Sequence, residues 1–406
     1  MPESSIKKYS PLVSERPPGK TVWRSGTFIS RPNRFTLILK DREPFRAYLP
    51  NTGRLEEFCT RTARFHAVPF DSARFRWRAV SSSLGGSPVL IDTVSMNGVG
   101  SMLIRLGHVP ELRLLAERAT GSREIPKAAL QSEKKLGRSR FDHYLKIGEA
   151  EAVVEVKTCT LVHRSTGLFP DAPSARAVMH IEHLRSLAQS GMTAVMIFII
   201  PGPEAAGLIP NFHTDPVFAS MLAEASGEVV FRAFRVGLLD PVTVDPSDVT
   251  EVPVILDRAR GAKDRGSYVI VLHNVERSRI RVGALGEIGF EPGYYVYVGS
   301  GMGGLDGRIK RHGMLKKKHR WHIDYIAPRP MKIVKSYPIR REDRIEGPLA
   351  SRMNALCNGR VRGFGASDSA HASHLFYFYD PPHENERFIS ALLDFKTFTG
   401  DGSPNG

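Results

Sequence analysis

The sequence predicts a multidomain protein in which an all-β domain is followed by an α/β domain and then by a second compact α/β unit. Three observations support this fold class. The chain has 406 residues, which exceeds the roughly 250 to 300 at which a single hydrophobic core stops growing. Short alternating apolar runs fill residues 23–84, which is typical of small β-sheet packing. Beyond them apolar strands alternate with amphipathic helical segments, which favours an α/β arrangement.

The domain boundaries follow from changes in composition. The start of the chain is rich in Pro, Ser and Lys without periodicity, which indicates a disordered arm. The apolar strand 193–200 is of the kind that lies in the middle of a sheet, and a later stretch with three prolines and scattered charges favours a linker. The predicted order is a disordered arm at 1–22, the all-β domain at 23–84, the α/β domain at 85–240, a linker at 241–264, the last domain at 265–381 and a tail, loosely helical and then disordered, at 382–406.

The composition points to a polyanionic partner. A net charge of +15 and a pI near 9.8 favour nucleic acid or an anionic membrane surface. The longest strongly apolar run, 194–200, is far shorter than the roughly 20 residues needed to span a bilayer. The cysteines lie far apart in no metal-ligand spacing. We therefore expect a soluble, cytoplasmic protein whose partner is nucleic acid and not a membrane.

One stretch, 137–160, sets charged side chains into an apolar, strand-like pattern. It predicts two strands, the first carrying Asp142 and the second Glu155 and Lys157. The latter two are two residues apart and therefore project from the same strand face. Two carboxylates can hold Mg²⁺, or alternatively Mn²⁺, while a lysine orients water or offsets charge on a phosphate, which suits phosphodiester cleavage. A solvated hairpin with cross-strand ion pairs is the alternative interpretation.

Positive charge gathers in two further places. Arginines lie among aromatic residues in the all-β domain, where they could hold a nucleic-acid backbone or simply cover the outer face of a barrel. A basic helix predicted at 304–315 and the segment after it carry many cations and one acid, which favours phosphate contact. The cations expected to contact nucleic acid are Arg34 and Arg54 in the first place and Arg311, Lys316, Lys317, Lys318 and Arg320 in the second.

Several motifs in the first half of the chain occur together. They are Arg34-Phe35, Pro50-Asn51-Thr52-Gly53-Arg54, Arg138-Ser139-Arg140-Phe141-Asp142, Val154-Glu155-Val156-Lys157-Thr158 and Phe169-Pro170-Asp171-Ala172-Pro173. With them, residues 30–236 resemble the sugar fermentation stimulation protein A (SfsA) family. The resemblance implies an N-terminal OB-like barrel, a central domain similar to the PD-(D/E)XK nucleases, and DNA binding. It implies Asp142 and Glu155 as metal ligands and Lys157 as the catalytic lysine.

A second set of motifs lies beyond residue 265. It comprises Gly266-Ser267-Tyr268, Tyr295-Val296-Tyr297-Val298-Gly299-Ser300, Arg308, Trp321-His322-Ile323-Asp324-Tyr325 and Glu346. This part resembles a GIY-YIG-like domain of uncharacterised function. The resemblance implies that Tyr268 or Tyr297 orients or deprotonates the nucleophile, that Arg308 contacts the scissile phosphate and that Glu346 holds a metal. Alternatively, the tyrosines are core residues and the arginine only docks on a phosphate.

Two functions remain from the sequence. The first is a Mg²⁺-dependent DNA or RNA nuclease with two nuclease-like modules and an OB-like binding domain, for which DNA is the expected partner. The second is a regulator that binds DNA without cutting it. The second is favoured by two departures from the SfsA pattern. Ser174-Ala175-Arg176-Ala177 replaces the family's Thr-Glu-Arg-Gly, so that a carboxylate is lost, and the segment before Pro110-Glu111-Leu112 is shortened and lacks an acidic residue expected on that helix.

Overall fold

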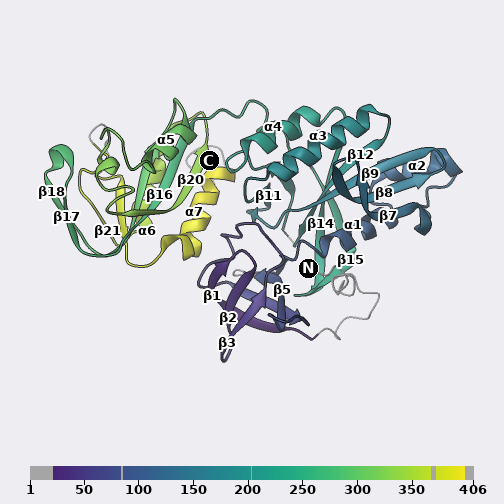
Figure 1. Ribbon diagram of the computed structural model, residues 1–406, viewed down its shortest axis with the longest axis horizontal. Helices are drawn as coiled ribbons and strands as arrows, with labels where there is room; N and C mark the ends of the chain where they lie inside the picture. Colours follow the sequence, from purple (N-terminus) through teal and green to yellow (C-terminus); the bar gives the residue numbers. More distant parts are fainter. Residues whose placement is uncertain (1–21, 84–85, 203, 367–371, 398–406) are drawn as a thin grey trace. The chain divides into compact units, whose positions relative to one another are not determined.

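The computed structural model describes residues 22–83, 86–202, 204–366 and 372–397, and the chain divides into two compact units after Arg260 (Figure 1). The expected disordered arm lies outside the described residues except for Val22. No helix among the described residues is long and apolar enough to cross a membrane.

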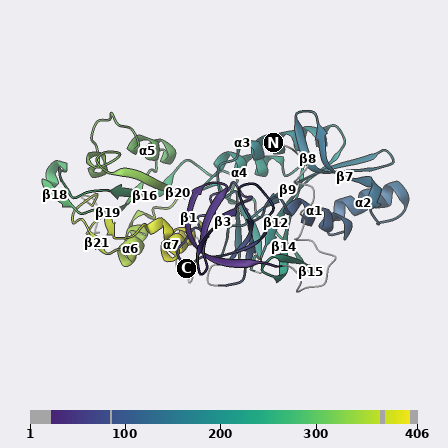
Figure 2. The same cartoon turned by 60° about the horizontal axis from the view of Figure 1, so that its bottom comes forward.

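The first domain is a closed β-barrel, as the sequence predicts. Its strands follow the order β3-β2-β1-β4-β5-β6, and a parallel pairing of Tyr48 with Arg78 joins β3 to β5 and closes the barrel (Figure 2). Alternate residues such as Leu37, Leu39 and Phe65 fill the interior. The strands are β1 (Arg24–Asn33), β2 (Thr36–Lys40), β3 (Pro44–Tyr48), β4 (Arg64–Pro69), β5 (Trp77–Ser83) and β6 (Val89–Leu90).

The barrel sheet extends further than its expected end at residue 84. Strand β6 pairs antiparallel with β5 through Ser81 and Leu90. The expected boundary at residue 84 therefore separates two strands that belong to the same sheet.

The second domain is an α/β sandwich around a six-stranded sheet of order β15-β14-β12-β9-β8-β7. Strands β9, β12 and β14 are parallel to one another, and β12 is buried in the middle of the sheet, as predicted. The sheet strands are β7 (Leu130–Leu136), β8 (Ser139–Ile147), β9 (Ala150–Thr158), β12 (Thr193–Pro201), β14 (Val230–Asp240) and β15 (Thr243–Val252), and a smaller sheet holds β10 (Val162–His163), β11 (Thr166–Phe169) and β13 (Gly207–Pro210).

Helices cover both faces of this sheet (Figure 1). Val154 and Ile197 of β9 and β12 pack toward one pair of helices, and their neighbours Val153 and Phe198 pack toward the other pair. Because both strand faces are buried, these strands are continuous apolar runs and do not alternate with polar residues. The first pair is α1 (Met96–Arg105) and α2 (Pro110–Thr120), preceding the short helix η2 (Lys127–Ala129); the second pair is α3 (Ala175–Gln189) and α4 (Pro216–Ala225).

The expectation of a linker at 241–264 is wrong for most of its first half. This segment contains β15, which pairs antiparallel with β14 from Asp240↔Thr243 to Ala233↔Val252 with two register irregularities. Its composition resembles that of a linker because β15 is an edge strand, where a proline such as Pro246 and charged side chains are tolerated. Such residues at an edge also discourage pairing with other chains.

The third domain is built on an antiparallel sheet of order β20-β16-β19-β22-β21, with a separate hairpin of β17 and β18. Residues of β16 and β19 pair from Ser267↔Ser300 to Asn274↔Gly293. Its strands are β16 (Gly266–Asn274), β17 (Ser278–Arg281), β18 (Glu287–Phe290), β19 (Gly293–Ser300), β20 (Lys332–Arg340), β21 (Gly359–Arg360) and β22 (Leu375–Phe378), and its helices are η3 (Gly283–Leu285), α5 (Leu305–His312), η4 (His322–Tyr325), α6 (Glu346–Leu356), η5 (Pro382–Glu384) and α7 (Glu386–Thr397).

The expected tail at 382–406 is helical in its first part, as predicted, but this helix packs against the domain and is not loose. Helix α7 buries Phe388, Leu392 and Phe395 against the domain and contacts α6 and β20. Its apolar residues recur at helical spacing, which is the pattern of a packed amphipathic helix. The part for which disorder is expected, 399–406, lies outside the described part of the chain.

Candidate functional site

Asp142, Glu155 and Lys157 lie together on the neighbouring strands β8 and β9 of the central sheet. The Asp142 Oδ2 accepts a hydrogen bond from the backbone N–H of Val156 at 2.7 Å. The Lys157 Nζ lies 2.5 Å from Glu155 Oε1, as expected for residues that share a strand face. The three residues that the sequence singles out are therefore neighbours in the fold.

Glu155 is buried and has one oxygen without a partner. Its Oε1 contacts Lys157 Nζ and His180 Nδ1. Its Oε2 is buried and has no hydrogen-bond partner among the described residues. Such an atom is costly to bury unless something compensates its charge. A cation bound between Glu155 and Asp142 would supply that compensation, and two carboxylates are the ligand type that a hard metal ion prefers. Among the described residues, no group of three or more His, Cys, Asp or Glu side chains is arranged to hold a metal, so water or phosphate oxygens would have to complete the coordination.

The two carboxyl groups titrate at different pH. Burial and then the neighbouring Glu155 carboxylate raise the pKa of Asp142 to about 6. Burial also acts to raise the pKa of Glu155, but hydrogen bonds and charges from His180 and Lys157 outweigh it and hold that pKa below its usual value. The hydrogen bonds and charges around Glu155 thus favour its ionised form, whereas burial disfavours the ionised form of Asp142.

Two residues outside the predicted site residues, His180 and Asn97, support this site. His180 on α3 is 2% exposed, and Arg176 Nε lies 3.5 Å from its Nε2, so its Nδ1–H is free to donate to Glu155. Asn97 on α1 donates through Nδ2 to Asp142 Oδ1 at 2.7 Å. The four-residue spacing of Arg176 and His180 places both on one helix face, which is a weak signal. Asn97 gives no signal, because it lies 45 residues from its partner.

The C-terminal domain gathers its own group of candidate residues. Tyr268 on β16 and Tyr297 on β19 are 1% and 6% exposed, and their ring centroids are 6.3 Å apart. Gly299 lies opposite Tyr268 in the register, and a Cβ there would lie 2.5 Å from the Tyr268 hydroxyl. The glycine therefore makes room for this hydroxyl. Burial raises the pKa of both tyrosines well above the ordinary value.

A histidine outside the predicted site residues contacts the first of these tyrosines. The Tyr268 hydroxyl lies 2.8 Å from Nε2 of His312, which is fully buried on α5. His312 Nδ1 lies 3.3 Å from Asp324 Oδ1. Burial lowers the pKa of His312 to about 4, although Asp324 acts in the opposite direction.

Arg308 and Glu346 act on the same tyrosines through their charges. The Arg308 charge lowers and the Glu346 charge raises the pKa of Tyr268 and of Tyr297. The Arg308 guanidinium lies 3.8 Å from the Trp321 ring centroid. Glu346 begins α6, and its Oε1 lies 3.2 Å from His374 Nδ1. All four residues expected from the GIY-YIG resemblance thus lie in one electrostatically coupled group.

The basic segment is less open than its sequence suggests. Lys316, Lys318 and Arg320 are exposed, as are Arg34 and Arg54 in the barrel. The Lys317 side chain is only 4% exposed, and its Nζ donates to the carbonyl oxygens of His312 at 2.6 Å and Ala327 at 2.7 Å. Lys317 is thus a structural residue, which corrects its expected role as a nucleic-acid contact.

Arg311 also has an internal partner. Its Nη1 lies 3.0 Å and 2.9 Å from the two carboxylate oxygens of Asp324. The Asp324 side chain is fully buried and the Arg311 side chain is only 20% exposed. The guanidinium group is therefore directed mainly at this carboxylate and not at solvent. Arg311 is therefore a weaker phosphate ligand than its exposed neighbours.

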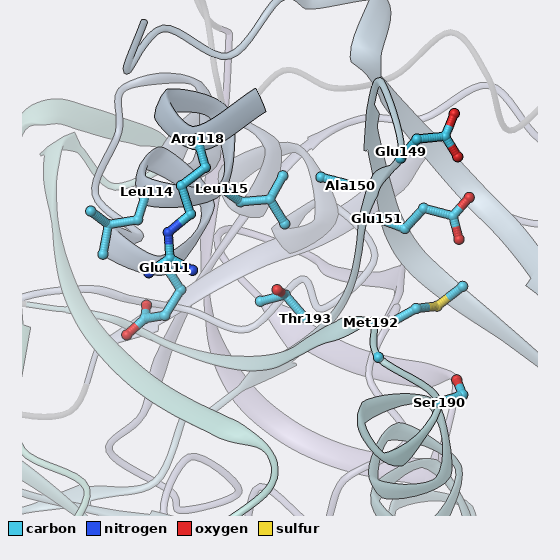
Figure 3. A pocket seen from close by; sticks show the side chains of 11 residues that line it. Glu111, Leu114, Leu115, Arg118, Glu149, Ala150, Glu151, Ser190, Met192 and Thr193 are labelled. Atoms are coloured by element: carbon cyan, nitrogen blue, oxygen red, sulfur yellow. The ribbon is translucent and has the colours of Figure 1, made fainter. Parts of the chain in front are cut away.

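The central domain also has a pocket, with a volume of 540 Å³, at the other end of β9. Figure 3 shows Leu114, Leu115 and Arg118 of α2 on one side of it and Glu149 and Glu151 on the other. The pocket opens where β9 begins, whereas Glu155 and Lys157 lie toward its end. In open sheets with parallel strands ligands bind beyond the carboxyl ends of the strands. The pocket is therefore separate from the carboxylate site.

Family models match the chain in three places. The SfsA N-terminal OB domain matches residues 29–91, the sugar fermentation stimulation protein RE domain matches 112–238, and a domain of unknown function, DUF123, matches 267–397. The fold and these matches define a three-domain protein with an OB barrel, an SfsA-type α/β domain and a C-terminal DUF123 domain.

The chain belongs to the sugar fermentation stimulation protein family, which confirms that resemblance. The sugar fermentation stimulation protein homolog of Moorella thermoacetica is 35% identical over 223 residues, 54% of this chain and 91% of that protein. The homolog of Carboxydothermus hydrogenoformans is 33% identical over 215 residues, 52% of this chain and 89% of that protein. A solved structure of Pyrococcus furiosus SfsA in complex with Ca²⁺ is 26% identical, with a TM-score of 0.49, and covers 58% of this chain and 96% of that one.

Proposed function

We propose that this protein is a metal-dependent nuclease that binds DNA and hydrolyses phosphodiester bonds of DNA or RNA at Asp142, Glu155 and Lys157. The single observation that carries the proposal is the buried, unpartnered Oε2 of Glu155 beside the Asp142 carboxylate and the Lys157 ammonium. The central domain would then be PD-(D/E)XK-like, with β8 supplying the aspartate and β9 the Glu-x-Lys pair. The net charge of +15 supports a polyanionic substrate.

The residues have separable tasks in this proposal. Asp142 and Glu155 would hold Mg²⁺ or Mn²⁺, which when bound polarises a phosphate oxygen or lowers the pKa of water. Lys157 sits at the edge of the carboxylate pair, where its ammonium can orient the attacking water or offset charge on the phosphate. His180 fixes the Glu155 carboxylate by contacting Oε1, which keeps Oε2 directed away from the histidine. Asn97 orients Asp142 in the same way from α1.

The C-terminal domain is proposed as a second, GIY-YIG-like site. The specific observation in its favour is the electrostatic coupling of Tyr268 and Tyr297 to both Arg308 and Glu346. Arg308 would clamp phosphate oxygens, Glu346 would hold a metal ion, and a tyrosine hydroxyl would share the proton of the nucleophile. The neutral His312 beside Tyr268 offers that proton an acceptor.

A cleavage assay on the full chain tests both sites. Labelled plasmid and oligonucleotide substrates are incubated with Mg²⁺ or Mn²⁺ and wild type, Glu155→Gln, Lys157→Gln or Glu346→Gln. The proposal expects cutting by wild type, and a loss in the first two variants. If only Glu346→Gln loses activity, the chemistry belongs to the C-terminal domain. The alternative, a regulator that binds without cutting, is favoured by Ala175 at the start of α3, where the family usually has a carboxylate. It predicts salt-dependent binding without cleavage.

A further inference from the structure

Three aromatic rings form a half-exposed cluster on the barrel, well apart in sequence from the carboxylate site. The Tyr48 ring stacks on Phe70 with centroids 5.4 Å apart and planes at 12°, and Phe75 lies 5.7 Å from Tyr48 at 49°. All three rings are intermediate in exposure. Tyr48 ends β3, while Phe70 and Phe75 flank the connection from β4 to β5, which the Phe70 N–H to Arg76 O hydrogen bond closes at 2.8 Å.

This aromatic cluster is held in place from the interior. The guanidinium of Arg78 lies 5.9 Å from the Phe70 ring centroid. Arg78 is itself buried and paired with the fully buried Asp92 at 2.6 Å. These contacts hold the rings in place in the absence of a ligand. A ligand that stacks on the rings therefore has a small free-energy cost for ordering side chains.

Arginines surround the cluster. Arg46 lies two residues before Tyr48 on the same face of β3, and its guanidinium is 5.6 Å from the Phe75 ring centroid. Arg74 and Arg76 are exposed on the β4–β5 connection, where Asp71 is the acidic residue. Within the described residues, no ion pair joins Arg46, Arg74 or Arg76 to a carboxylate. Arg46 therefore places a guanidinium group without a carboxylate partner beside the rings, and Arg74 and Arg76 add exposed positive charge to the same connection.

We propose that the aromatic cluster, together with Arg46, is a binding site for single-stranded nucleic acid. Ring faces stack on bases of any sequence, while arginines follow the backbone, and only a single strand offers its base faces freely. The third strand and the β4–β5 connection are part of the surface on which OB folds bind oligonucleotides. This inference rests on the proposed function and deepens it, because it assigns the strandedness of the substrate.

A short series of contacts connects this surface to the carboxylate site. Asp92, the partner of Arg78, accepts a hydrogen bond from the Ser95 N–H at 3.2 Å, directly before α1. Asn97 in the first turn of α1 donates to Asp142. The segment that holds Arg78 beneath the rings thus continues directly into α1, the helix that orients a candidate metal ligand.

Fluorescence anisotropy of labelled oligonucleotides, recorded in EDTA so that nothing is cut, tests this site. The full chain is titrated with single-stranded DNA, single-stranded RNA and a duplex of the same sequence. Wild type is expected to bind a single strand more tightly than the duplex. Tyr48→Leu and Phe75→Leu each remove a ring and should weaken single-strand binding about five-fold or more. Arg46→Gln should reduce the slope of log K against log salt concentration by about one unit, which corresponds to the loss of one phosphate contact.

Matched controls remove the same groups elsewhere. Tyr379→Leu removes a tyrosine that is 69% exposed in the C-terminal unit, and Arg279→Gln removes an exposed arginine on β17; neither should change single-strand binding. Circular dichroism checks that each variant is folded. If Tyr48→Leu or Phe75→Leu does not fold, the change in salt dependence of Arg46→Gln tests the inference instead. Tighter binding of the duplex, or wild-type binding by the ring and Arg46 variants, would overturn the inference. Since cleavage is measured separately, that failure would be distinct from a failure of the nuclease proposal.

Discussion

The hydroxyl of Tyr268 lies 2.8 Å from Nε2 of His312, in a part of the C-terminal domain where both side chains are buried. Since Asp324 faces Nδ1 of the same ring at 3.3 Å, the Nδ1–H donates to the carboxylate and Nε2 accepts the hydrogen bond from the tyrosine. Asp324, His312 and Tyr268 thus form a directed series of hydrogen bonds that ends beside Tyr297.

Replacing His312 by Phe should destabilise the C-terminal domain by about 1–3 kcal/mol, because the Tyr268 hydroxyl would lose its partner in a buried setting. The double variant with Tyr268→Phe should recover part of this loss. Hydrogen exchange of β16 and β19 amides in the full chain measures the effect. Strictly additive effects of the two substitutions would contradict the hydrogen bond as a stabilising pair.

Stability should fall with rising pH because of Glu57 in the barrel domain. Burial and then the Asp171 carboxylate raise the pKa of Glu57 to about 8 from an ordinary value of 4.5. A raised folded-state pKa means that the contribution is complete below pH 4.5 and is lost as pH rises through 8. Urea unfolding between pH 5 and 9 should show a decline of a few kcal/mol. Glu57→Gln should flatten the decline, and an unchanged profile in this variant would exclude Glu57 as its cause.

Gly53 should not tolerate a side chain. A Cβ at this position would lie 2.3 Å from Asp171 Oδ2, and that oxygen accepts a hydrogen bond from the Leu55 N–H at 3.1 Å. Gly53→Ala should therefore cost about 1–3 kcal/mol of the unfolding free energy of the first unit. Gly227→Ala is the control, since nothing lies within 4 Å of its added Cβ. Equal stability of the two variants would show that the Asp171 contact is dispensable.

The neighbouring lysines 316 and 317 should behave differently. Lys317→Ala removes an ammonium that satisfies two buried carbonyl oxygens, so it should destabilise the C-terminal domain by about 1–3 kcal/mol. Lys316→Ala changes an exposed residue and should alter stability by less than about 0.5 kcal/mol. If Lys316 contacts phosphate, its loss should reduce the salt slope of DNA binding by about one unit. Thermal melts and binding titrations at several salt concentrations separate these effects.

The sequence predicts features that depend on local pattern. The apolar run of β12 locates the middle of the sheet, and the two-residue spacing of Glu155 and Lys157 places them on one strand face. Features that depend on partners far away in the chain cannot be predicted from local sequence patterns. Asn97 reaches Asp142 across 45 residues, and His312 meets Tyr268 across 44. Lys317 is charged in sequence, but only the folded chain from 312 to 327 shows that its ammonium points inward.

Two errors have a common physical origin. Strand β15 contains a proline and several charges because it lies at a sheet edge, and these residues favour a linker when the partner strand is unknown. Helix α7 follows a Pro-rich turn near the end of the chain, where fraying is the usual expectation. In both cases pairing or packing with a distant element determines the structure, and local composition does not report it.

The most direct test of the central proposal is the rate of Mg²⁺-dependent DNA cleavage by Glu155→Gln relative to wild type. The substitution keeps the size of the side chain and removes the charge of the unpartnered oxygen. We predict cleavage by wild type and a fall of about 100-fold or more in the variant, in line with the loss of a metal-supported transition state. Binding of the same DNA should persist in EDTA. Equal cleavage by the two proteins, or none by wild type under conditions in which it binds DNA, would contradict the assignment of this site.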